Sequence, residues 1–214
     1  MKKILLLSAI AACTAISVSA QISKGSAYVG GLININNTSN QYGTDPEVKQ
    51  NSFLISPSIG FAYAENSMWG INLNYGHSKT ENTGLNYDLN TYGLGVYLRQ
   101  YKPMGKGFYF FAQEALNGNY TKGTRELTNL YDVKELDITL GISPGFAYDV
   151  SKKFQLEILL NNLFFADYSQ SRTTTQSTAT PIVTKTKEFG IGSNLSSIAQ
   201  VGSVSIGARF VFGR

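Results

Sequence analysis

Four charged residues sit where side chains alternate between two faces of the chain. Arg99, Asp137, Glu157 and Arg209 fall on the face made of small and polar residues, opposite a face of large apolar ones. If the polar face turns inward, these charges must pair with one another or stay hydrated. Such a cluster can form a salt-bridge network that fills an interior, or a constriction that selects ions.

His77-Ser78 is the only pair of residues that suggests nucleophilic catalysis. Neighbouring residues on a strand point to opposite faces, so this histidine is not expected to activate the serine beside it. The chain has one His and one Cys, which argues against a zinc site, a disulfide scaffold and a Cys/His hydrolase. The scattered glycines form no phosphate-binding loop. We therefore expect no catalytic site, no metal, no cofactor and no enzyme activity.

The elements that position these residues are predicted to be β-strands. Large side chains alternate with small ones from Leu136 to Tyr148, from Phe53 to Tyr63 and near the C-terminus, and helical periodicity is absent. The pattern predicts eight strands, at 26–36, 51–63, 68–78, 89–101, 107–119, 133–148, 154–168 and 199–212.

The connections between these strands alternate in length. Those near 64–67, 102–106 and 149–153 are short, whereas those near 37–50, 79–88, 120–132 and 169–198 are long and rich in Asn, Ser, Thr and Gly. Short turns on one side and long loops on the other are typical of a transmembrane barrel. The segment 169–187 is expected to be a long polar loop, either simply solvated or a binding surface.

The apolar face decides which side of the sheet meets lipid. It carries large side chains, with rings near the strand ends, as expected of aromatic girdles at the membrane surfaces. The predicted girdle residues are Tyr63, Trp69, Tyr75, Tyr92, Tyr148 and Phe154. We predict an all-β fold, an eight-stranded antiparallel up-and-down transmembrane barrel. Its interior is just wide enough for side chains to fill, which favours the filled network over the ion-selective constriction.

Glu114 is the one charged residue whose face the pattern leaves open. It points to lipid if the turn at 102–106 pairs its strands as the other short turns do, and inward if a bulge intervenes. A carboxylate facing lipid is costly near the bilayer midplane and tolerable near its surfaces.

The first 20 residues have the layout of a secretory signal peptide. Lys2 and Lys3 precede an apolar run, and Val18-Ser19-Ala20 offers small residues for cleavage after Ala20. A lipoprotein box ending at Cys13 is the alternative, but the residues after Cys13 stay apolar. The predicted organisation is a signal peptide at 1–20 and one barrel domain at 21–214. Cleavage would lower the net charge from +4 by the two lysines, so the charge does not argue for nucleic acid.

Residues 21–214 resemble small eight-stranded outer-membrane barrels of the OmpA/OmpX type. The resemblance is to the outer membrane β-barrel domain or porin-family proteins common in Bacteroidetes-type bacteria. It rests on Gly93-Leu94-Gly95-Val96-Tyr97-Leu98-Arg99 with Tyr101-Lys102-Pro103, on Phe108-Tyr109-Phe110-Phe111, and on the closing Gly207-Ala208-Arg209-Phe210-Val211-Phe212. Such barrels usually end on an aromatic residue, but here Gly213 and Arg214 follow Phe212.

The resemblance implies an integral protein of the outer membrane of a Gram-negative bacterium. We expect a structural or surface-interaction role for the long loops, with a narrow passive pore as the alternative. A lipid A-modifying hydrolase is a more distant one. The expected partners are outer-membrane lipid, the barrel-assembly machinery during biogenesis and an extracellular ligand at the loops, and the protein is expected to be a monomer.

Overall fold

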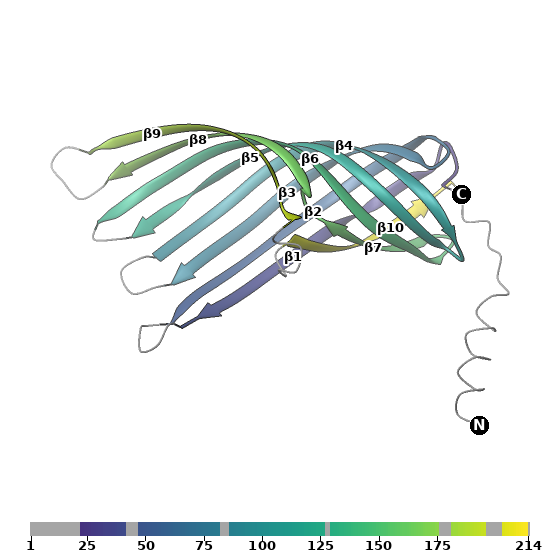
Figure 1. Ribbon diagram of the computed structural model, residues 1–214, viewed down its shortest axis with the longest axis horizontal. Helices are drawn as coiled ribbons and strands as arrows, with labels where there is room; N and C mark the ends of the chain where they lie inside the picture. Colours follow the sequence, from purple (N-terminus) through teal and green to yellow (C-terminus); the bar gives the residue numbers. More distant parts are fainter. Residues whose placement is uncertain are drawn as a thin grey trace, which may run out of the picture.

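A closed wall of antiparallel strands encloses the interior of the protein (Figure 1). The computed structural model describes residues 22–41, 47–81, 86–126, 129–175, 181–195 and 203–213. The strands are β1 (Ala27–Asn40), β2 (Val48–Ala64), β3 (Ser67–Glu81), β4 (Asn86–Gly105), β5 (Phe108–Glu126), β6 (Leu130–Ser151), β7 (Phe154–Leu160), β8 (Phe164–Thr175), β9 (Val183–Ser193) and β10 (Val204–Phe212). No helix long and apolar enough to cross a membrane occurs among these described residues.

Eight strands close the barrel. Strands β1 to β6 pair in sequence order, β6 pairs with β7, β7 with β10, and β10 returns to β1 through the register Ala27↔Phe212 to Ile33↔Ile206. Every one of these pairings is antiparallel. The predicted fold class, an eight-stranded antiparallel barrel, is therefore confirmed.

The short turns lie where the sequence predicts them. They occupy residues 65–66, 106–107 and 152–153. Asn66 has a φ of 57°, a left-handed conformation that asparagine tolerates better than most residues. Its amide donates to the carbonyl of Ile22 over 3.0 Å, and Ile22 is fully buried. The segment before β1 therefore folds across the turn end of the barrel.

The wall is interrupted between β7 and β8. The predicted strand 154–168 divides there, because residues 161–163 turn away from β6 before β8 resumes pairing with it at Ile142. Pro144 lies on β6 between the part paired with β7 and the part paired with β8. Proline has no N–H to donate, so it fits a position where the ladder on that side is broken.

Three of the predicted loops consist of strand over at least half of their length. β1 and β2 reach Asn40 and Val48, β3 and β4 reach Glu81 and Asn86, and β5 and β6 reach Glu126 and Leu130. Backbone pairing continues in these segments although they have no apolar face. The alternation of apolar side chains was the only pattern used to place the strands. The predicted loops at 37–50, 79–88 and 120–132 were therefore too long.

The predicted polar loop at 169–187 was also wrong. β8 runs on to Thr175, and β9 pairs with it from Val183 to Ser193. This stretch is rich in threonine, which favours strands whatever its polarity. The predicted strand 199–212 is shorter than expected, since β10 begins at Val204; positions 199–202 lie outside the described residues.

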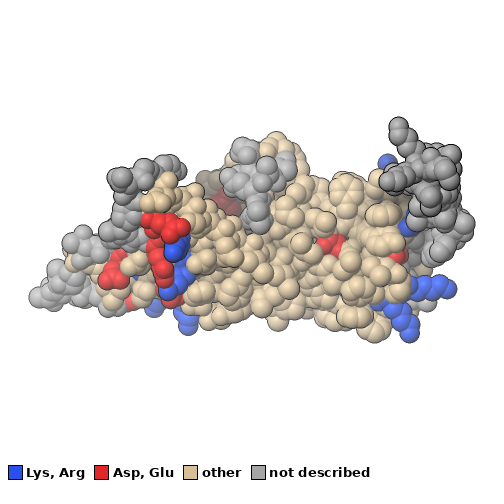
Figure 2. All heavy atoms as spheres, turned by 90° about the horizontal axis from the view of Figure 1, so that it is seen from below, with Lys and Arg blue, Asp and Glu red and all other residues tan. Residues whose placement is uncertain are grey.

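Two aromatic belts mark the ends of an apolar band on the outer surface. The turn-side belt comprises Tyr63, Trp69, Phe108, Tyr148, Phe154 and Phe210, and the loop-side belt comprises Phe53, Tyr75, Tyr92, Tyr120 and Tyr168. From Phe53 to Tyr63 the strand rises about 33 Å, or about 25 Å along the axis of a barrel with strands tilted by ~40°. Figure 2 shows charged side chains gathered mainly toward the two ends of the molecule, with a broad zone between them that has few charged atoms.

Candidate functional site

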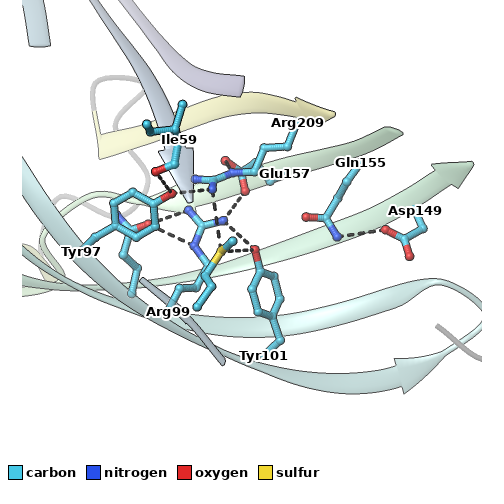
Figure 3. Close-up of polar contacts among 10 residues, drawn as sticks. Ile59, Tyr97, Arg99, Tyr101, Asp149, Gln155, Glu157 and Arg209 are labelled. Atoms are coloured by element: carbon cyan, nitrogen blue, oxygen red, sulfur yellow. Dashed lines mark hydrogen bonds and ion pairs between the residues drawn. The ribbon is translucent and has the colours of Figure 1, made fainter. Parts of the chain in front are cut away.

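Two arginines and one glutamate meet inside the barrel (Figure 3). Arg99 comes from β4, Glu157 from β7 and Arg209 from β10, and all three are almost completely buried. Each carboxylate oxygen of Glu157 binds a different arginine: Arg209 Nε donates to Oε1 over 2.9 Å, and Arg99 Nη1 donates to Oε2. Glu157 therefore links opposite parts of the wall.

Neutral side chains complete the network. Gln113 Oε1 accepts from Arg99 Nε over 3.0 Å and from Arg99 Nη2 over 2.6 Å. The hydroxyl of Tyr101 accepts from Arg99 Nη1 over 3.1 Å, and that of Tyr97 accepts from Arg209 Nη1 over 2.9 Å. We call this set the plug. It comprises Arg99, Glu157, Arg209, Gln113, Tyr97, Tyr101 and Met68, whose sulfur lies near both Tyr101 and Arg209.

Aromatic rings pack against the buried charges. The guanidinium carbon of Arg99 lies 4.1 Å from the ring centroid of Phe111, and that of Arg209 lies 5.4 Å from the ring centroid of Tyr97. Cation–π contacts of this kind strengthen when water is excluded. The plug thus fills the turn-side half of the lumen with stacked and hydrogen-bonded side chains.

Glycines in the wall make room for the plug. A Cβ atom on Gly70 would lie 2.3 Å from Cζ of Tyr97, and one on Gly30 would lie 2.8 Å from Cγ of Arg209. Contacts that short do not occur between real atoms, so the large side chains lie across glycine backbone. The inward face therefore combines small residues with a few large side chains that lie across them. The sequence pattern alone did not reveal this packing.

Asp137, the fourth residue of the predicted network, lies apart from the plug. It sits on the inner face of β6, opposite Asn119, and accepts a hydrogen bond from Thr139 Oγ1 over 2.7 Å. The alternation of side chains predicts which face of the sheet a residue lies on. It does not predict the height of the residue along the barrel axis, which depends on the register between neighbouring strands. Tyr97 and Tyr101 share the inward face with Arg99, so the same alternation could have found these members of the plug.

The predicted girdle residues all lie on the outer surface. Tyr63, Trp69, Tyr148 and Phe154 belong to the turn-side belt, and Tyr75 and Tyr92 to the loop-side belt. Neighbouring rings contact one another across strands, with centroids 5.4 Å apart for Tyr75 and Tyr92 and 4.5 Å apart for Phe108 and Tyr148. Glu114 is exposed on the same outer surface, between Leu98 and Ile142 on the flanking strands.

A polar cavity of about 390 Å³ lies against the plug, on its loop side. Its floor includes Tyr97, Gln113 and Arg209. One wall carries a ladder of amides in which Asn72 Nδ2 donates to Asn117 Oδ1 over 3.0 Å and Asn74 Nδ2 donates to Asn119 Oδ1 over 3.1 Å. The cavity is therefore lined by groups that can both donate and accept hydrogen bonds.

His77 and Ser78 do not form a catalytic pair. His77 Nδ1 lies 3.2 Å from Asn90 Oδ1 and 3.8 Å from Asp88 Oδ1, and its ring lies near that of Phe53 on the outer surface. No hydrogen bond joins it to Ser78 in the described chain. Within the same residues, no group of three or more His, Cys, Asp or Glu side chains could hold a metal ion.

The closed sheet, the apolar band between two aromatic belts and the filled polar lumen define a transmembrane β-barrel. The chain belongs to the family described as outer membrane protein beta-barrel domain, whose model matches residues 4–196. It is thus an outer-membrane barrel protein, and the resemblance found in the sequence is confirmed. No curated protein matches the chain.

Several solved structures are similar to this chain. Neisserial surface protein A is 15% identical, with a TM-score of 0.45, over 88% of this chain and 98% of that one. A major outer membrane protein of Thermus thermophilus is 11% identical, with a TM-score of 0.41, over 87% and 99%. The translocator domain of the autotransporter NalP from Neisseria meningitidis is 13% identical, with a TM-score of 0.42, over 95% and 93%.

Proposed function

We propose that this protein is a non-enzymatic surface-interaction protein whose barrel anchors a projecting contact surface in the outer membrane of a Gram-negative bacterium. The proposal rests mainly on the length of its strands beyond the loop-side belt. β5 continues from Tyr120 to Glu126, and β8 from Tyr168 to Thr175. Six or seven residues of strand reach about 20 Å, so these hairpins extend well past the apolar band.

The projecting strands offer two kinds of contact surface. A hollow of about 670 Å³ at the tips of β2 to β5 is lined by both signs of charge, including Lys49, Lys79, Glu81 and Glu126. In the described sheet β9 pairs only with β8, so its other edge has backbone groups available for an added strand. The part of this edge beyond the loop-side belt runs from Val183 to Glu188, which pairs with Thr174 to Ser169 on β8.

The alternative is a narrow passive pore. The polar cavity on the loop side of the plug favours a pore, because a channel needs a polar entrance of this kind. The plug opposes it, because Arg99, Glu157, Tyr109 and Phe111 are almost entirely buried in the turn-side half. Conduction would require these side chains to separate, and removing one partner from a buried ion pair is costly. We therefore favour the anchored surface over the pore.

Trimmed variants test the surface role. Gln170 and Lys187 are paired across β8 and β9, so an Asn-Gly turn can join them and replace the hairpin tip. Lys79 and Asp88 offer the same join across β3 and β4. We expect cells carrying the full chain to adhere to fibronectin-, mucin- or cell-coated surfaces, and at least one trimmed variant to lose this adhesion while its barrel stays folded.

Conductance in planar bilayers separates the two functions. The purified protein should show no steady channel, whereas a variant with both Arg99→Ala and Arg209→Ala should leak. A steady conductance in the unmodified protein, together with adhesion that no trimming changes, would contradict the surface role and favour the pore. For biogenesis we propose removal of residues 1–20, insertion by the barrel-assembly machinery and a monomer in outer-membrane lipid.

A further inference from the structure

We propose that the cavity beside the plug is a binding site for a small hydroxylated anion, held by Arg209 through a carboxylate or phosphate group. This site lies inside the barrel and is independent of the surface role proposed above. The observations that carry it are an unbalanced buried charge, an arginine nitrogen without a partner and the chemistry of the cavity wall.

The plug holds one more positive charge than negative. Arg99, Arg209 and Glu157 are the only charged side chains that are fully buried in the described part of the chain. Two guanidinium groups facing one carboxylate leave a net charge of +1 inside the barrel. An uncompensated charge in a protein interior is costly, so an anion beside the arginines would be stabilised.

Arg209 has a whole guanidinium nitrogen without a partner, whereas every nitrogen of Arg99 has one. All three nitrogens of Arg99 donate to Glu157, Gln113 or Tyr101. Arg209 uses Nε for Glu157 and Nη1 for Tyr97, but Nη2 has no hydrogen-bond partner among the described residues. The residue is 2% exposed and lines the cavity. A guanidinium edge of this kind suits the oxygens of a carboxylate or phosphate.

Asp149 is another acidic residue near the plug, and its carboxylate already has partners. Asp149 accepts from Gln155 Nε2 over 2.9 Å and from the hydroxyl of Tyr109 over 3.1 Å. Figure 3 shows it on the far side of Gln155 from the two arginines, and no ion pair joins it to them in the described chain. The anion must therefore come from outside the described chain.

Ser58 provides a second unpartnered group in the same cavity. Its Oγ is buried and has no hydrogen-bond partner among the described residues, and its side chain lines the cavity. Gly30 pairs with Ser58 on one side and with Arg209 on the other. The side chain of Arg209 lies against Gly30, whose missing Cβ leaves it room. Ser58 and Arg209 thus flank the same short stretch of wall.

The rest of the cavity indicates what the anion carries. Apart from Arg209, its described lining contains no Lys, Arg, Asp or Glu side chain, and it is rich in Asn, Ser and Thr. Amides and hydroxyls both donate and accept, which matches the hydroxyl groups of a sugar or hydroxy acid. A volume of about 390 Å³ is within the range of small-molecule sites. A uronic acid or a sugar phosphate has the required chemistry.

Calorimetry on the full chain in lipid nanodiscs tests the site without any substitution. The probes are glucuronate, glucose 6-phosphate, acetate and glucose. We expect glucuronate or glucose 6-phosphate to bind with one site per chain, and glucose to bind at least about tenfold more weakly. The two anions distinguish a carboxylate ligand from a phosphate ligand. Equal binding of glucose, or no anion binding up to the millimolar range, would overturn the proposal.

An internal anion should compete for the site. Ser58→Asp places a carboxylate in the cavity and should weaken glucuronate binding at least about tenfold. Ser58→Asn adds similar volume without charge and should weaken it far less. Ser23→Asp adds the same charge at an exposed position before β1, and controls for net charge. Equal affinity in the Ser58→Asp and Ser23→Asp proteins would contradict a site at Arg209.

Discussion

Glu157 is the residue on which the buried charges depend. It is the only acidic partner of both Arg99 and Arg209 in the described residues. Arginines do not lose their charge by deprotonation at ordinary pH. The two arginines can therefore stay buried only because the carboxylate of Glu157 balances part of their charge.

Removing the charge of Glu157 should therefore destabilise the barrel strongly. We expect Glu157→Gln to lower the free energy of unfolding by about 3–5 kcal/mol, because two guanidinium groups lose their only counter-charge. Urea titration in lipid vesicles measures this, with Glu65→Gln at an exposed turn as the control. Replacing Arg99, Glu157 and Arg209 together by apolar residues should cost less than the single change. A larger cost for the triple variant would mean that the ion pairs themselves stabilise the fold.

Glycine substitutions distinguish crowded from open positions in the wall. Gly70→Ala puts a Cβ 2.4 Å from the carbonyl oxygen of Ile59, whereas a Cβ on Gly118 meets nothing within 4 Å. We expect Gly70→Ala to destabilise the barrel by about 1–3 kcal/mol and Gly118→Ala to be nearly neutral. The same urea titration compares them. Equal stability of the two variants would show that Tyr97 can move aside without cost.

Single residues were predictable only in part. The alternation placed Arg99, Glu157 and Arg209 on the inward face, where the structure has them. It could not separate them from Asp137, because height along the barrel is set by register and tilt between strands. It left the face of Glu114 open for a similar reason, since the geometry of the turn at 106–107 was unknown.

At the scale of elements, the strands that face lipid were easier to predict than those beyond it. Alternation is strong from Phe53 to Tyr63 because one side meets hydrocarbon and the other a packed lumen. From Ser169 to Thr175 both faces of the strand are polar, so no apolar period marks the end of β8 or the start of β9. Their pairing is carried by backbone hydrogen bonds, which leave no periodic signature in the sequence.

The projecting strands also gather acidic groups. Glu135 lies on β6 beyond the loop-side belt, and Asp137 and Glu188 are close enough to affect it. Partial burial, with a smaller effect of these two carboxylates, raises the pKa of Glu135 above its ordinary value of 4.5. The folded protein then binds this proton more tightly than the unfolded chain. Stability should therefore fall as the pH rises from 4.5 through the raised pKa.

The variant Glu135→Gln should remove this part of the pH dependence. We expect it to be more stable than the original protein at neutral pH and to lose that advantage below pH 4.5, where the carboxyl is protonated in both states. Urea unfolding across this range measures the difference. A constant difference at all pH values would show that the effect comes from packing and not from charge.

For the whole molecule, we expect the aromatic belts to set its depth in the membrane. On the outer face of β5, Phe108 belongs to the turn-side belt and Tyr120 to the loop-side belt, and Glu114 lies midway between them along the strand. An exposed carboxylate at this height contacts hydrocarbon and has no ion pair in the described chain.

Replacing this carboxylate should stabilise the inserted barrel. We expect Glu114→Leu to raise the free energy of unfolding in vesicles by about 1–2 kcal/mol, less than the effect of a basic residue at the midplane. Glu65→Leu, at a turn outside the apolar band, should give no such gain. If Glu114→Leu instead destabilises the protein, the carboxylate has a partner in the membrane.

The join between β1 and β10 determines the order in which the protein can be assembled. It pairs residues 27–33 with residues 206–212, almost the two ends of the described chain. Contacts between such distant residues form late, because the loop between them must first be closed. Until β10 arrives, β1 has an unpaired edge that hydrocarbon does not tolerate. A chain that stops before Val204 is therefore not a smaller barrel but an open sheet, and completion of the whole chain must precede its entry into lipid.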